Sequence, residues 1–134
     1  MRPNPRAEAE RRLAQARSDL VSARVLAREG LYAQACFHCP QAAEMALKAV
    51  HYLRGARFVV GHSVVDLLAG LIEVYPSLEH LRRAAASLDR LYIPTRYPNG
   101  LPGGVPAEVF AEEDAADATQ QATLFVEQAA TIIG

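Results

Sequence analysis

The chain has 134 residues, 51% of them hydrophobic and 22% charged, which is ordinary for a soluble globular protein, and we expect one domain over residues 1–134. The formal net charge of −1 excludes a general attraction to nucleic acid or to anionic membranes. No apolar run approaches the ~20 residues of a membrane span, and the first residues lack the hydrophobic core of a signal peptide, so we expect no membrane association and a cytoplasmic location.

The first half of the chain predicts two long helices. Asn4 and Pro5 form a favourable helix start, with asparagine as the N-cap and proline at the first helical position, and Gly30 ends this helix. A second helix runs from about residue 31 to residue 53. Pro40 lies inside it, where proline removes a hydrogen bond and costs about 3 kcal/mol or a kink, so we expect the helix to bend there.

The second helix separates into two faces when its residues are placed at 100° per step. One face is wide, apolar and formed by small side chains: Ala35, Cys36, Cys39, Ala42, Ala43, Ala46, Leu47 and Val50. The other is a stripe of mixed polar side chains: His38, Gln41, Glu44, Lys48 and His51. This stripe is either a solvated face with a Glu44–Lys48 pair at i,i+4 spacing, or one wall of a polar pocket in which Lys48 contacts an anion.

The second half predicts shorter helices and one long loop. Ser63 and Asp66 form an S-x-x-D capping box that opens a short apolar helix, and a further helix follows Pro76 and runs to about Tyr92. Residues 93–111 hold four prolines and three glycines, which excludes a helix or strand of any length and predicts a functional or disordered loop. A last helix follows. The predicted fold is an all-α, up-and-down antiparallel bundle of four to five helices with a long Pro/Gly-rich loop before the last helix.

The two cysteines, Cys36 and Cys39, have C-x-x-C spacing, which suggests a zinc half-site or a redox dithiol. A zinc site needs two further ligands at suitable spacing, and a thioredoxin-like motif needs a βαβ context, and the sequence has neither. We therefore interpret the cysteines as two small buried thiols, and we expect no metal and no cofactor.

The candidate ligand site lies in "DRLYIPTRYPNG", residues 89–100. Arginine side chains bind phosphate through their guanidinium forks, and tyrosine rings provide flat faces for a base. The last 28 residues have a net charge of −6, so an anion should avoid the last helix and bind the middle of the chain. We predict ligand contacts from Arg90, Tyr92, Arg96 and Tyr97, completed by Lys48 and His62 if the loop folds back across the second helix.

A structural role for the same residues is the alternative. Tyr92 would then end the fourth helix in the core, and Arg90 would pair with Asp89 or Glu44. Arg96 would hold the loop by bonding backbone carbonyl groups.

Three segments in order resemble the HEPN domain family. The core Gln41 to Ala49, "QAAEMALKA", resembles the family's second-helix signature, and "GHSVVDLLAGL" resembles the short T-H-x-L-x-x-L stretch that follows and supplies His62. "YIPTRYPNG" resembles the family's Y-x-P-x-R-Y-P-D loop, although Asn99 stands where an aspartate is common, which argues against a metal in this loop.

The resemblance implies an antiparallel helical bundle, often a homodimer, that acts on nucleotides or RNA, frequently beside a small nucleotidyltransferase in a toxin–antitoxin-like pair. Many members are ribonucleases with an R-x(4–6)-H motif near the last helix. No such motif occurs there; the one formal match, Arg57 to His62, lies between the second and third helices. Three functions stay open: a nucleotide- or RNA-binding module, a metal-independent RNase using Arg57 and His62, and a non-catalytic dimeric scaffold.

Overall fold

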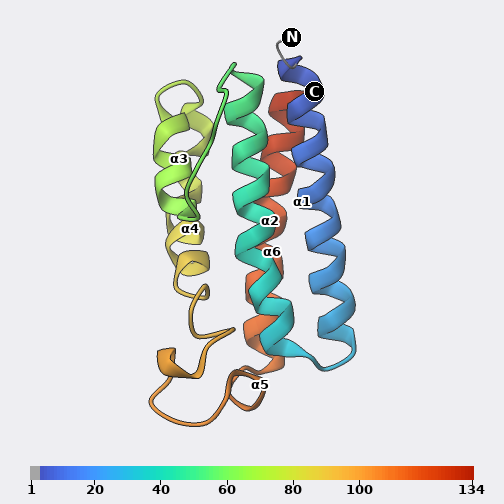
Figure 1. Ribbon diagram of the computed structural model, residues 1–134, viewed down its shortest axis with the longest axis vertical. Coiled ribbons are helices and arrows are strands. Elements are labelled where there is room, and N and C mark those ends of the chain that lie inside the picture. The colour runs from blue at the N-terminus through green and yellow to red at the C-terminus, as the bar shows by residue number, and fades with distance from the viewer. Residues whose placement is uncertain (1–3) are drawn as a thin grey trace.

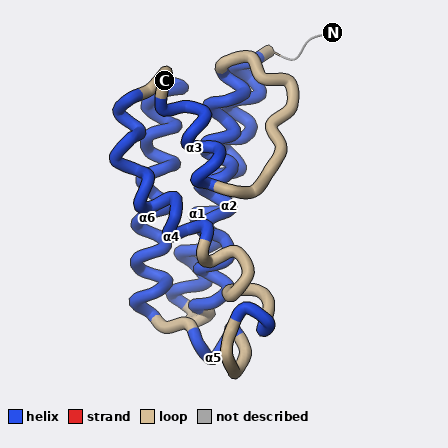
Figure 2. Tube along the Cα trace, turned by 90° about the vertical axis from the view of Figure 1, so that its left-hand side faces the viewer, coloured by secondary structure: helices blue, strands red, loops and turns tan. Residues whose placement is uncertain are grey.

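The computed structural model describes residues 4–134, and in that range the chain is helical with no strands (Figures 1 and 2). Residues 1–3, with which the predicted domain begins, lie outside the described part. The helices are α1 (Pro5–Arg28), α2 (Tyr32–Leu53), α3 (Val64–Ile72), α4 (Arg82–Asp89), α5 (Pro106–Val109) and α6 (Glu112–Ile133), with 3₁₀ helices η1 (Pro76–Leu81) and η2 (Pro98–Gly100). This confirms the predicted all-α antiparallel bundle.

Helix α2 is the centre of the bundle. It packs against α1 and α6, which also contact each other, while α3 and α4 cover its other side (Figure 1). Both ends of the described chain lie at the same end of the bundle, and the 93–111 segment with α5 lies at the opposite end. No helix in the described range is long and apolar enough to cross a membrane.

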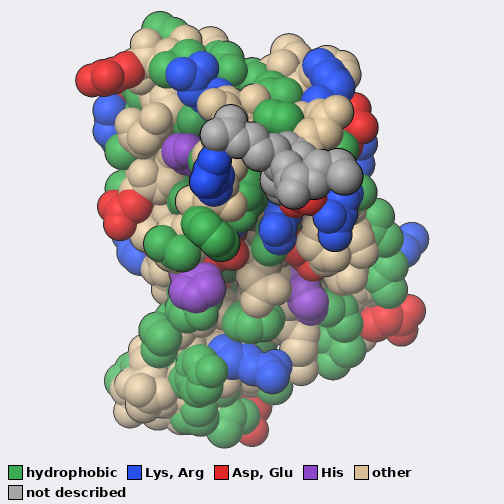
Figure 3. Space-filling view, turned by 45° about the horizontal axis from the view of Figure 1, so that its top comes forward, with side chains coloured by type: hydrophobic (Ala, Val, Ile, Leu, Met, Phe, Trp, Pro, Cys, Tyr) green, Lys and Arg blue, Asp and Glu red, His purple; other side chains and the backbone are tan. Residues whose placement is uncertain are grey.

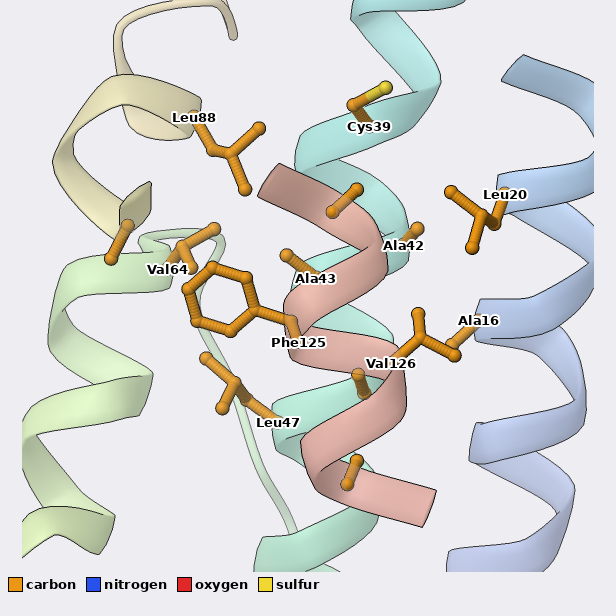
Figure 4. Close-up of a cluster of buried hydrophobic side chains, with 14 of the residues drawn as sticks. Ala16, Leu20, Cys39, Ala42, Ala43, Leu47, Val64, Leu88, Phe125 and Val126 are labelled. Carbon is orange, nitrogen blue, oxygen red and sulfur yellow. The ribbon is translucent and has the colours of Figure 1, made fainter. Parts of the chain in front are cut away.

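The core consists of small side chains around a few large ones. All eight residues predicted for the apolar face of α2 are buried, and their small size lets α1 and α6 approach α2 closely. Phe125 of α6 is the largest fully buried side chain, and its ring lies near Leu47 of α2, Val64 of α3 and Leu88 of α4 (Figure 4). These contacts join the two sides of the bundle.

The first two helices begin and end close to their predicted positions. The side chain of Asn4 accepts hydrogen bonds from the backbone N–H groups of Arg6 at 2.9 Å and Ala7 at 3.3 Å, as expected of an N-cap. Gly30 has a φ of 79°, the left-handed conformation that favours glycine after a helix. Helix α2 continues as one helix through Pro40, which is buried, so proline does not interrupt it.

The second half differs from prediction in detail. The helix expected after Pro76 is divided into η1 and α4, which ends at Asp89 rather than near Tyr92. The 93–111 segment was expected to lack helix but contains the three-residue η2 and the four-residue α5. Each of these short helices begins at a proline, whose fixed φ suits the first helical position.

Candidate functional site

A buried carboxylate on α2 organises the polar stripe. Glu44 is only 8% exposed; its Oε2 accepts a hydrogen bond from Lys48 Nζ at 3.3 Å, and its Oε1 lies 2.9 Å from His62 Nδ1. The Lys48 side chain is itself 11% exposed. The Glu44–Lys48 pair therefore forms as the spacing predicts, but it lies under the surface rather than in solvent.

His62 is the exposed member of this group. Its side chain is 67% exposed, and its ring stacks on Tyr92 with centroids 5.7 Å apart and an interplanar angle of 20°. When Nδ1–H donates to Glu44, the neutral imidazole keeps a free lone pair on Nε2. The structure thus brings together three of the predicted residues, with His62 and Tyr92 in contact and Lys48 joined to His62 through Glu44.

Asp89, at the end of α4, binds the start of α3, directly after His62 in the sequence. Its carboxylate accepts hydrogen bonds from the N–H groups of Val64 at 2.7 Å and Val65 at 3.1 Å, and from the Ser63 hydroxyl at 2.9 Å. Ser63 also caps α3 as predicted, because its Oγ accepts from the Asp66 N–H at 3.1 Å. The start of α3 is thereby attached to the end of α4.

Arg96 forms a second group nearer the start of α2. Its guanidinium carbon lies 5.2 Å from the ring centroid of Phe37, a cation–π geometry, and the side chain is exposed. Phe37 in turn makes an edge contact with His38, at a centroid distance of 5.8 Å. The neighbouring Thr95 is buried, and its hydroxyl donates to the Leu91 carbonyl within the same segment.

The other predicted residues are exposed but separate. Within the described residues, the side chain of Arg90 bonds Ser87 Oγ, at 3.4 Å, and pairs with neither Asp89 nor Glu44. Tyr97 is 50% exposed. Within residues 4–134, Arg57 makes no hydrogen bond or ion pair with His62.

The α2 residues of the Glu44 group and of the Arg96 group lie on one stripe of that helix. Phe37, Gln41, Glu44 and Lys48 follow three-and-four spacing, so Phe37 and Lys48 are separated by ~16 Å along the helix. Figure 3 shows histidine side chains on one face of the molecule among hydrophobic and basic side chains. The site is therefore an open face rather than a closed pocket.

Two residues of this face, Glu44 and Phe37, were not predicted as site residues, and neither were two exposed residues of the loop that precedes His62. Glu44 was interpreted as a partner of Lys48 or of Arg90. Phe37 was left off the polar stripe although its angle, about 260° from His38, falls within it. Phe58 and Val60, in the loop between α2 and α3, are 87% and 85% exposed.

The cysteines are buried, as expected. Burial raises the pKa of Cys36 to about 12 and that of Cys39 to about 11, so both are neutral thiols at physiological pH. Cys39 Sγ donates to the Ala35 carbonyl at 3.3 Å. Residues 4–134 contain no group of three or more His, Cys, Asp or Glu side chains that could hold a metal ion.

The HEPN domain family matches residues 9–132 of the chain. The protein belongs to the HEPN domain family. Three solved structures extend this result. TT1696 from Thermus thermophilus is 43% identical with a TM-score of 0.84, over 91% of this chain and 98% of that one. ST0689, an archaeal HEPN homologue, is 31% identical with a TM-score of 0.79, over 95% and 98% of the two chains.

An HEPN domain protein from Thermotoga maritima is 30% identical with a TM-score of 0.72, over 91% of this chain and 96% of that one. No curated protein matches the chain. The comparisons thus confirm the family and the fold of this HEPN domain.

Proposed function

We propose that this HEPN domain binds a nucleotide or RNA on the face formed by Arg96, Phe37, His62 and Tyr92. The observation that carries the proposal is the position of Arg96, an exposed residue of the 93–111 segment whose guanidinium carbon lies 5.2 Å from the ring centroid of Phe37. Such an arginine presents N–H donors to phosphate, while partly exposed aromatic rings and the exposed imidazole of His62 can stack on bases. Helix α6 is acidic and has no basic residue, so it offers no cation to an anionic ligand.

Binding is tested by calorimetric titration of the protein with ATP, GTP and a short single-stranded RNA, at low and moderate salt. Removing a phosphate contact in Arg96→Ala should weaken binding about tenfold or more. If the RNA is the ligand, the slope of log K against log salt should also fall by about 0.7 for that one contact.

Arg82→Ala is the matched control. Arg82 is an exposed arginine whose Nε lies 2.6 Å from Glu79 Oε1 in a surface pair, so its loss removes one positive charge and little stability. Equal weakening in both variants would indicate a general charge effect and contradict the assignment of Arg96. A flat titration for every ligand would leave the non-catalytic scaffold as the function of the isolated domain.

A metal-independent RNase is the second candidate, and the contact between His62 and Glu44 favours it. A carboxylate that accepts from Nδ1–H orients the imidazole and leaves Nε2 free to take a proton from a ribose 2′-hydroxyl. Cleavage of a labelled RNA in the presence of a chelator should be lost in His62→Ala and reduced in Glu44→Gln. His80→Ala, which changes another exposed histidine, is the control; cleavage that survives His62→Ala would reject this candidate.

We also propose that residues 1–134 form a single domain, that the protein is a homodimer and that it is cytoplasmic. We propose further that it acts with a small nucleotidyltransferase partner in a toxin–antitoxin-like pair. The partner is tested by co-purification of the two proteins from a host that expresses both. Loss of that complex in a Tyr97→Ala variant would place the partner on the 93–111 segment, because Tyr97 is half-exposed there.

A further inference from the structure

The segment between α2 and α3, residues 54–63, exposes two large hydrophobic side chains. It runs back along α2 before α3 begins (Figure 1). Phe58 is 87% exposed and Val60 is 85% exposed, while Val59 between them is partly buried against the core. The side chains of these three residues thus alternate between solvent and the bundle, as they do along a β-strand.

The backbone groups of this segment are unpaired within the described part of the chain. No hydrogen bond in residues 4–134 joins an N–H or C=O group of residues 57–61 to another backbone group or to a side chain. The backbone bonds on either side run from the Ala56 N–H to the His51 carbonyl, at 3.2 Å, and from the Leu67 N–H to the Ser63 carbonyl, at 3.0 Å. An exposed run of unpaired backbone groups is a template for pairing with another extended chain.

The same segment is basic. Arg54 and Arg57 are exposed, and residues 54–63 include no acidic residue. Arg54 lies 5.9 Å from the ring centroid of Tyr75, and within residues 4–134 neither arginine forms an ion pair. An occupant that carries carboxylates beside apolar side chains therefore complements this segment.

We propose that residues 57–61 bind an extended acidic peptide segment of another protein, which pairs with them as a β-strand. Its backbone bonds the free N–H and C=O groups, and its apolar side chains cover Phe58 and Val60. Its carboxylates meet Arg54 and Arg57. A lipid bilayer suits this segment less well, because it would leave the same backbone groups without partners. The inference goes beyond the proposed function and shares no residue with the ligand face.

The occupant is identified by selecting a random peptide display library against the full chain. We expect enriched sequences in which apolar side chains alternate along the peptide and acidic residues outnumber basic ones. In anisotropy titrations of a selected peptide, Phe58→Ser and Val60→Ser should each raise the dissociation constant about tenfold or more. Val74→Ser is the matched control, because Val74 is 44% exposed and lies outside the segment. Circular dichroism checks that each variant stays helical.

The charge contribution is tested in the same titration. Arg57→Gln should weaken binding of the acidic peptide, and the difference from the wild type should shrink as salt is raised, since salt screens exposed charges. Arg83→Gln, which changes an exposed arginine of α4, is the control. A library that yields no such peptide, or a selected peptide that binds the Phe58 and Val60 variants as tightly as the wild type, would overturn the proposal.

Two N-methylated forms of one selected peptide test the strand pairing itself. Alternate residues of a strand direct their N–H groups to the same edge, so methylation of one alternate set should raise the dissociation constant about tenfold or more. Methylation of the other set should leave binding nearly unchanged, and equal effects of the two sets would overturn the pairing. Self-association of the chain, or sedimentation with phosphatidylserine vesicles, that Phe58→Ser abolishes would identify a different occupant and also overturn the proposal.

Discussion

At the scale of single residues, Glu44 is a buried carboxylate with two partners of different kinds. A carboxylate that is 8% exposed must be compensated, and here an ammonium and an imidazole share it from opposite oxygens. Asp19 on α1 lies close enough to be affected by it: burial raises the pKa of Asp19, and the charge of Glu44 adds to the rise. The negative charge of Glu44 thus interacts with Asp19 on α1, Lys48 on α2 and His62 in the loop before α3.

Removing the Glu44 side chain should lower the free energy of unfolding more than removing the Lys48 charge. Glu44→Ala leaves Lys48 buried without its partner, and we expect a loss of about 3 kcal/mol in the free energy of unfolding. Lys48→Met keeps the stem volume, and Glu44 retains His62, so the expected loss is about 1 kcal/mol. Urea denaturation of both variants measures this difference. Equal losses of unfolding free energy in the two variants would mean that the buried charge of Lys48 is not stabilised by Glu44.

Helical spacing was sufficient to predict the Glu44–Lys48 pair but not its burial. Both residues lie on one turn of α2, so their contact follows from sequence separation alone. The contact of Glu44 with His62 joins residues 18 apart through a loop, and no periodicity specifies how that loop runs. His62 entered the prediction through the family resemblance, while its stacking on Tyr92 depends on where α4 ends.

At the scale of elements, Asp89 links α3 and α4. A helix N-terminus has unpaired N–H groups and a partial positive charge, and Asp89 satisfies two of those groups from outside α3. The S-x-x-D pattern predicted the Ser63 cap, but the carboxylate that completes the α3 terminus comes from residue 89 rather than residue 66. Local patterns identify a helix start and cannot identify a tertiary cap.

Asp89→Ala should therefore destabilise the start of α3. Three hydrogen bonds to the carboxylate are lost, and we expect a decrease of about 2 kcal/mol in the free energy of unfolding. Amide hydrogen exchange should accelerate at the start of α3, above all at Val64 and Val65, while α1 exchanges as in the wild type.

Asp66→Ala provides the comparison for Asp89→Ala. Its carboxylate also lies in the first turn of α3 but is exposed, so its loss should cost less than about 1 kcal/mol. If the two variants are equally destabilised, general helix electrostatics rather than the specific cap would explain the effect.

At the scale of the whole molecule, the sequence predicted the bundle because the buried stripes of its long helices are regular. The apolar faces of α1, α2 and α6 follow helical spacing without interruption, and they form most of the core. The division between η1 and α4 had no such signal, because Leu78, Leu81, Ala85 and Leu88 keep helical spacing across it. The open face could not be predicted fully, since it is assembled from a helix, a loop and the segment after α4.

The buried thiols should make global stability fall at high pH. The pKa values of Cys36 and Cys39 are raised by burial from 9.0 to about 12 and about 11, so above pH 9 the unfolded chain loses thiol protons that the native protein keeps. Their contribution is complete below pH 9 and is lost as the pH rises toward these native values. Each thiol gives a slope of up to about 1.4 kcal/mol per pH unit. In urea denaturation under reducing conditions, a Cys36→Ala/Cys39→Ala variant should therefore lose stability less steeply above pH 9, and equal slopes in variant and wild type would show that other groups control the alkaline transition.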